Sequence, residues 1–117
     1  MNDRTLLELA ARAAGYKLSW SYDNHCCWIN EMRHDFDVTW NPRDDDGDAL
    51  RLAVKLGIVV TPDRENQRTL VSNSAGHEYC AIYWDKLGEM AATRLAITEA
   101  AAEIGKSMTQ PGATSSP

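Results

Sequence analysis

The sequence has no apolar run long enough to span a bilayer, and its opening residues, M-N-D-R-T, lack the pattern of a secretion signal. Positive charge is not in excess either, because 12 lysines and arginines stand against 17 aspartates and glutamates, a net charge of −5. Nucleic acid is bound through basic surface, so it is not an expected partner. These absences predict a soluble protein of the cytoplasm without membrane contact.

Cysteine is scarce, and its placement does not predict a disulfide framework. Cys26 and Cys27 are adjacent and Cys80 stands alone, which fits a reducing compartment better than a set of disulfide bonds. Three histidines could be combined with these thiols in a zinc site: His25, His34 and His77. The spacings typical of zinc sites are absent, and nothing marks a partner that would orient a Cys–His nucleophile pair. We therefore predict no cofactor and no catalytic residue, and we interpret Cys80 as a small core residue of a strand.

Phenylalanine is nearly absent, since a single one stands beside four tryptophans and four tyrosines. Tryptophan and tyrosine join an apolar body to a polar edge, which makes them frequent at binding interfaces. They also suit strand packing, and we expect half or more of one set to lie in the core: Trp20, Trp40, Tyr83 and Trp84. The candidate binding residues are His25, Trp28, Trp40 and Trp84. Trp28 comes first among them, because it lies outside any clean strand pattern.

The most informative stretch, residues 38–57, joins an expected strand to an expected helix. The strand is indicated by Phe36, Val38 and Trp40, which alternate with polar residues as in a strand with one buried face. Pro42 ends it, because proline has no N–H for a ladder. Aspartates then begin the helix. Asp44 or Asp45 is the expected cap.

The helix expected over residues 45–56 carries Asp48 in its first turn, where negative charge suits the helix dipole. Its apolar face comprises Leu50, Leu52, Ala53, Val54 and Leu56. Gly57 is the expected end of the helix.

The aspartates of this turn could alternatively form a divalent cation site: Asp44, Asp45, Asp46 and Asp48. A calcium-binding loop needs oxygen ligands at its first and twelfth positions. Counting from Gly47 places Pro42 and Ala53 there, so the pattern fails at both ends. We therefore predict a structural role for the cluster and no metal site, and keep a small metal-dependent enzyme as an alternative.

The rest of the chain predicts two further helices and several short strands within one domain of residues 1–106. The first helix is capped by Asn2 or Asp3 and closed by Gly15, and the last runs over residues 86–104 and is ended by Gly105. The other expected elements are a strand at 17–22, an irregular region at 23–34, a strand at 58–61 ended by Pro62, a hairpin of 69–72 with 79–84, and a disordered tail at 107–117. This is an α+β fold with three helices and a mainly antiparallel sheet of about four strands, the first and last helices lying on the sheet.

Three blocks of the sequence resemble the phage alpha-beta-alpha sandwich family, small proteins of tailed phages and prophages. They are L-L-E-L-A-A-R-A-A-G, W-N-P-R-D-D-D-G-D-A-L-R-L-A-V-K-L-G and A-A-T-R-L-A-I-T-E-A-A-A-E-I-G, which together span residues 5–105. The region 23–34 and the tail depart from the family pattern. The resemblance implies an alpha-beta-alpha sandwich and a phage origin, and it supplies no catalytic residues.

The resemblance and the missing catalytic constellation together favour a non-catalytic binding protein of the host bacterial cytoplasm. Such a protein would act on a host protein or sequester a small host signalling molecule, for example in counter-defence. An accessory protein of the virion or of phage DNA handling is the other alternative. Self-association into a homo-oligomer is left open.

Overall fold

The computed structural model of the chain describes residues 2–20, 27–31 and 36–108, with side chains for 2–20 and 39–108. This part of the chain forms three helices and six strands. The helices are α1 (Asp3–Ala14), α2 (Asp46–Leu56) and α3 (Glu89–Met108). The strands are β1 (Leu18–Trp20), β2 (Cys27–Glu31), β3 (Phe36–Thr39), β4 (Val59–Asp63), β5 (Arg68–Ser72) and β6 (Glu78–Tyr83).

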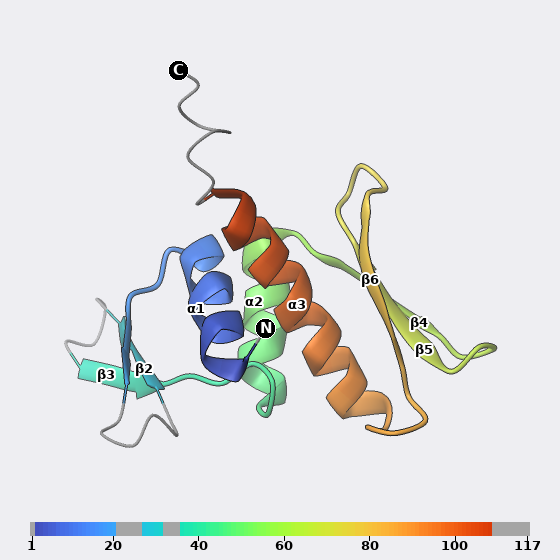
Figure 1. Ribbon diagram of the computed structural model, residues 1–117, viewed down its shortest axis with the longest axis horizontal. Helices are drawn as coiled ribbons and strands as arrows, with labels where there is room; N and C mark the ends of the chain where they lie inside the picture. The colour runs from blue at the N-terminus through green and yellow to red at the C-terminus, as the bar shows by residue number, and fades with distance from the viewer. Residues whose placement is uncertain (1, 21–26, 32–35, 109–117) are drawn as a thin grey trace.

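The strands form two antiparallel sheets, and the helices lie between them (Figure 1). The strand order is β1-β2-β3 in one sheet and β4-β5-β6 in the other. The α+β class, the three helices and the antiparallel pairing are as the sequence predicts. The arrangement of layers differs from the expected sandwich, because two three-stranded sheets stand in place of one sheet of about four strands.

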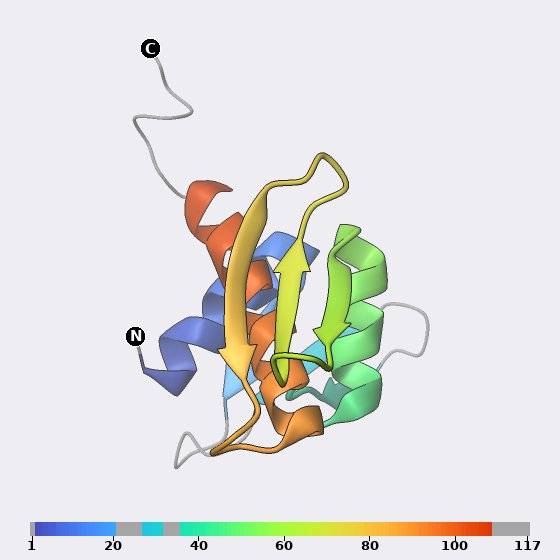
Figure 2. The ribbon, with the colours of Figure 1, turned by 90° about the vertical axis from the view of Figure 1, so that its right-hand side faces the viewer.

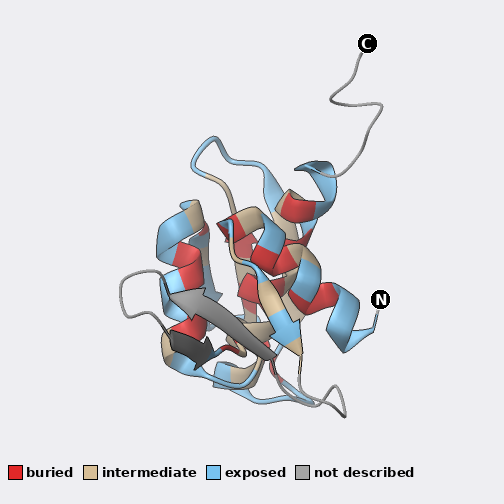
Figure 3. Cartoon of the chain, turned by 90° about the vertical axis from the view of Figure 1, so that its left-hand side faces the viewer, coloured by how far each residue is buried: buried red, intermediate tan, exposed pale blue. Residues whose placement is uncertain are grey.

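Both expected caps of α1 are present. The Asn2 side chain accepts a hydrogen bond from the Thr5 N–H at 2.8 Å, and Gly15 ends the helix in the left-handed region at φ 79°. The buried face of α1 consists of Leu6, Leu7, Ala10, Ala11 and Ala14. This face packs mainly on α3, whereas the sequence predicted that it would lie on the sheet. The packed faces of the helices are visible in Figure 3.

The sequence predicted that Gly105 would end α3, but this residue lies inside the helix. The helix continues to Met108. A methyl group at Gly105 would overlap the Leu9 carbonyl oxygen, so glycine permits the close approach of α1 to α3. The helix begins at Glu89, three residues later than expected, after Gly88 at φ 91°. Residues 107 and 108, expected in the tail, are therefore helical, and residues 109–117 lie outside the described residues.

The hairpin predicted from the sequence is present, and it covers α3 on the side away from α1 (Figure 2). Within the hairpin, Val71 and Thr69 of β5 are fully buried. The preceding strand, β4, passes through Pro62 instead of stopping there. An edge strand tolerates a proline, since its outer side has no ladder to complete.

The first sheet contains a strand that was not expected. Residues 23–34 were predicted to be irregular, yet β2 runs from Cys27 to Glu31 between β1 and β3. The strand expected at 17–22 begins at Leu18, and its last two residues lie outside the described residues. Leu18 and Trp20 of β1 are partly buried and pack against the core.

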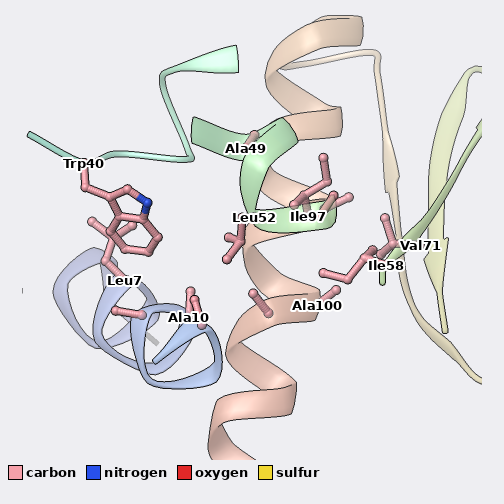
Figure 4. Packing of buried hydrophobic residues seen from close by; sticks show 14 residues of the cluster. Leu7, Ala10, Trp40, Ala49, Leu52, Ile58, Val71, Ile97 and Ala100 are labelled. Atoms are coloured by element: carbon pink, nitrogen blue, oxygen red, sulfur yellow. The ribbon is translucent and has the colours of Figure 1, made fainter. Parts of the chain in front are cut away.

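The core is built at the meeting of the three helices and the second sheet (Figure 4). Leu52 of α2 is almost fully buried. The other large side chains of the same cluster include Ile97 of α3, Val71 of β5 and Trp40. Alanines fill the rest of the helix contacts, which keeps the helices close together. No helix in the described part of the chain combines the length and the apolar character needed to cross a membrane.

Candidate binding surfaces

Asp45, and not Asp44, caps α2. Its carboxylate accepts a hydrogen bond from the Asp48 N–H at 2.8 Å. The Asp44 carboxylate lies 2.9 Å from the side-chain nitrogen of Asn41 and closes the turn that precedes the helix. The sequence left these two aspartates as alternatives, and the structure separates their roles.

Asp48 does more than place a negative charge in the first turn of α2. Its side chain is buried, and one carboxylate oxygen accepts the Asn41 backbone N–H at 2.9 Å. The other accepts the Arg51 guanidinium at 2.7 Å, which raises the pKa of Arg51 above its ordinary value. Asp48 therefore joins Asn41, which follows β3, to the start of α2, in addition to placing a negative charge in the first turn of the helix.

Asp46 connects α2 to α3. Its carboxylate lies 2.7 Å from Arg94, whose Nε also donates to the Arg43 carbonyl at 2.7 Å. Arg43 in turn forms an ion pair with Asp3 at the start of α1. Each of the four aspartates of the turn thus has a partner within the protein, and Arg51 lies close to both Asp45 and Asp48. Within residues 2–20, 27–31 and 36–108 no group of three or more histidine, cysteine, aspartate or glutamate side chains could hold a metal ion.

The candidate zinc residues are not brought together where the structure describes them. Cys80 is half-buried in β6, with its Sγ 3.7 Å from the Ala96 carbonyl oxygen. Burial raises the pKa of its thiol to about 11, with smaller contributions from Glu99, Glu78 and Glu103, so the thiol is protonated at neutral pH. His77 is exposed and stands edge-on to Tyr79, with ring centroids 5.2 Å apart. Of the remaining four, His25, Cys26 and His34 lie outside the described residues, and Cys27 begins β2, where only the backbone is described.

Two of the four candidate binding residues belong to the core. Trp40 is 4% exposed and meets the ring of Tyr16 edge-on at 5.6 Å. Trp84 is 9% exposed, and its indole N–H donates to the Thr69 hydroxyl at 2.9 Å. Neither ring can be a contact surface without opening the core.

The other two candidates fall in or beside the region without described side chains. Trp28 lies in β2, paired through its backbone with Ser19 and Thr39, and His25 lies outside the described residues. Of the remaining aromatic residues expected in the core, Trp20 is partly buried against it. Tyr83, in contrast, is exposed on the outer face of β6, where Arg68 lies over its ring.

An apolar groove that sequence reasoning missed lies between α2, α3 and β4. Leu50 and Val54 of α2 were expected to be packed, but they are 63% and 73% exposed. Met90 of α3 is 55% exposed nearby. The groove has a volume of about 290 Å³, and Ala53, Val60 and Ile97 are among its apolar lining residues. We call it the α2 groove.

The sequence contained one signal for the α2 groove. Six of the eleven residues of α2 are alanine, leucine or valine, which is more than one packing face needs. Ala49, Leu52 and Ala53 point into the core, and the surplus residues Leu50 and Val54 face outward. Sequence periodicity shows that the apolar sector is wide but not which part of it the core will cover.

A second hollow region lies at the opposite edge of the second sheet, between β6 and α3. It consists of two adjoining depressions of about 260 and 540 Å³, which share Tyr79 and Glu103 as lining residues. Glu99 of α3 and Leu6 of α1 also line it. We call it the β6 groove.

Comparison with known proteins adds no relative to this description. No family model matches the sequence, no curated protein resembles it significantly, and no solved structure matches its fold significantly. A functional assignment therefore depends on the surfaces described above.

Proposed function

We propose that this chain is a non-catalytic binding protein that acts on a host protein and contacts it through the α2 groove. The observation that carries the proposal is the exposure of Leu50 and Met90 in the lining of an apolar groove, with Val54 exposed beside it on α2. Contiguous exposed apolar surface of this kind is typical of protein interaction sites. Isolated exposed leucines would need no such explanation, but Leu50 and Met90 line one hollow, and Val54 follows Leu50 one helical turn later on the same side of α2.

The α2 groove stands on a rigid support. Its floor includes Ala53 and Ile97, which belong to the core, and the Asp46–Arg94 ion pair holds the start of α2 to α3 beside it. A preformed groove loses little conformational entropy on binding, which favours affinity. The exposed side chains at its rim supply apolar area that a partner protein can bury.

A protein partner suits this surface better than a small charged molecule. The groove is open, and its few polar side chains, Asp46, Thr93 and Arg94, are hydrogen-bonded or ion-paired within the protein. Small-molecule sites are generally more enclosed and present a few convergent polar groups to the ligand. Sequestration of a small host signalling molecule is therefore the weaker form of the proposal.

The phage origin and the host bacterial cytoplasm rest on the sequence resemblance alone and are part of the proposal. The alternative of a metal-dependent enzyme at Asp44, Asp45, Asp46 and Asp48 has less support, because these carboxylates already serve as a cap, a turn closure and ion pairs. Recruiting them to a metal would break those contacts.

The test compares Val54→Glu and Leu50→Glu with a control substitution at the far end of α3. Met108→Glu is the matched control, because Met108 is also an exposed apolar helix residue but lines the β6 groove and not the α2 groove, so it tests whether capture depends on the α2 groove. Each tagged full-length protein is used to capture partners from a bacterial lysate, and its melting temperature is measured. We expect the wild type and Met108→Glu to retain the same host protein, and both α2 variants to lose it without a change of more than about 2 °C. Equal capture by all four proteins, or capture of no defined partner, would contradict the proposal.

A further inference from the structure

The β6 groove combines a strand edge with an acidic, partly aromatic hollow. Its first depression is lined by Leu6, Tyr79, Cys80, Glu99, Ala102 and Glu103. The second continues past Tyr79 and Glu103 toward the end of α3. The groove therefore lies between the first half of β6 and the last turns of α3.

A bulge in β6 directs Tyr79 into this groove. Cys80 pairs with Val71 and Glu78 pairs with Ser72, so Tyr79 is an extra residue in the ladder. Neighbouring residues of a regular strand point to opposite faces, yet Tyr79 and Cys80 both pack against the core side. Bulges commonly redirect a side chain in this way.

The outer edge of β6 has hydrogen-bonding groups without a partner strand. β6 is the last strand of its sheet. The Trp84 N–H donates to the Gln67 carbonyl, so the alternation of an antiparallel ladder turns the N–H and C=O groups of Ala81 and Tyr83 away from β5. In the described part of the chain, these two residues form no backbone hydrogen bond with a loop or a turn either. Such an edge is a template for another extended chain.

Two carboxylates, Glu99 and Glu103, line the β6 groove, and Glu78 lies close enough to contribute to the raised pKa of Cys80. Glu99 and Glu103 come from α3 and Glu78 from β6, and none of them forms a salt bridge with a lysine or arginine in the part of the chain that the structure describes. The raised pKa of the Cys80 thiol has these three carboxylates among its causes, after burial. A partner that enters the groove would therefore meet a surface complementary to positive charge.

We propose that the free edge of β6 and the β6 groove bind an extended peptide segment that carries lysine or arginine at alternate positions. The segment pairs with Ala81 and Tyr83 as an added strand. Its alternate side chains fall on the face shared with Cys80 and Ile82, where Glu99 and Glu103 lie. This site is independent of the α2 groove, since the two lie at opposite edges of the second sheet.

The test uses the full chain and a fluorescein-labelled, terminally blocked peptide of alternating threonine and lysine, with binding followed by fluorescence anisotropy. We expect saturable binding that weakens roughly fivefold or more in the Glu99→Gln, Glu103→Gln double variant, since two attractive charge contacts are removed. Glu65→Gln, which removes a charge in the turn between β4 and β5, should leave the affinity unchanged. Val54→Glu should also leave it unchanged, which separates this site from the proposed function.

Two further measurements distinguish strand addition from simple attraction of positive charge. A version of the peptide with N-methyl groups on alternate amides keeps its charge but cannot form a ladder, and we expect it to bind at least about tenfold more weakly. Nuclear magnetic resonance should show slower amide exchange at Ala81 and Tyr83 when the unmodified peptide is bound. Absence of peptide binding, equal binding of the N-methylated peptide or of spermine, or equal weakening by Glu65→Gln would each overturn the proposal.

Discussion

Gly105 of α3 packs directly against the backbone carbonyl of Leu9 in α1, and this contact sets the distance between the two helices. The surrounding interface is made of small residues, since Ala10, Ala11 and Ala101 are almost fully buried. The two helices cross each other, as the view in Figure 2 shows. A side chain at position 105 would have no room unless one helix moved.

Gly105→Ala should therefore destabilise the protein, although alanine is the better helix former. In an exposed helix the change would stabilise by about 0.5–1 kcal/mol. Here the added methyl group meets the Leu9 backbone, and overpacking of this kind costs about 1–3 kcal/mol. We expect thermal unfolding to show a melting temperature lower by a few degrees. Ser107→Ala, at an exposed position of the same helix, is the control and should leave it unchanged. A variant at Gly105 as stable as the wild type would mean that the helices do not approach this closely.

The position of Gly105 inside α3 shows what local sequence signals can and cannot predict. A glycine after a long apolar stripe is a standard helix end, and Gly15 and Gly57 do end α1 and α2 as predicted. At Gly105 the packing of α1 overrides the local preference, because the helix gains more from the contact than it loses in propensity. The sequence shows the glycine but not the neighbouring helix.

Asp48→Ala should cost more stability than Asp45→Ala. Loss of the Asp45 cap is expected to cost about 0.5–2 kcal/mol. Loss of Asp48 leaves the partly buried Asn41 N–H without its acceptor, in addition to the lost contact with Arg51, and should cost about 1–3 kcal/mol. Asp44→Ala removes an exposed hydrogen bond and should cost about 0.5 kcal/mol or less. Urea unfolding of the three variants measures this order, and a larger loss for Asp45→Ala would contradict the role of Asp48.

Calcium, magnesium and manganese should not raise the melting temperature of the wild type, and a chelator should not lower it. The physical reason is that these carboxylates already have protein partners. Asp45 accepts the Asp48 N–H, Asp46 pairs with Arg94, and Asp48 pairs with Arg51, which also lies 4.0 Å from Asp45. A rise of several degrees with any of these metals, lost in Asp46→Asn, would show instead that the turn rearranges into a cation site.

The turn around these aspartates could be predicted because its signals are local. Asn41 and Asp48 are seven residues apart, and proline, aspartate and glycine each have a defined preference there. β2 could not be predicted in the same way, since its place in the sheet comes from pairing with β1 and β3. The α2 and β6 grooves also depend on the tertiary fold, because residues distant in sequence line both of them.

Cys80 should react slowly with alkylating reagents in the folded protein. Burial, followed by the charges of Glu99, Glu78 and Glu103, raises the pKa of its thiol from 9.0 to about 11, which lowers the thiolate fraction at pH 8 about a hundredfold. Labelling with iodoacetamide, followed by mass spectrometry of the tryptic peptide between Arg68 and Lys86, separates Cys80 from the other two cysteines. We expect slow labelling at pH 8 that accelerates toward pH 11, and fast labelling at pH 8 in urea.

The same shift in pKa predicts how stability depends on pH at the alkaline end. The folded state holds the Cys80 proton more tightly than the unfolded chain, whose thiol has its ordinary pKa of 9.0. The stabilisation is complete below about pH 9 and is lost as the pH rises toward 11, because only the unfolded state then releases the proton. Cys80→Ala removes this titration, so urea unfolding of the variant should show a smaller decrease in stability between pH 9 and 11 than the wild type. The same decrease in both proteins, together with equal labelling in native and urea-unfolded protein at pH 8, would show that the thiol is freely solvated and not held against α3.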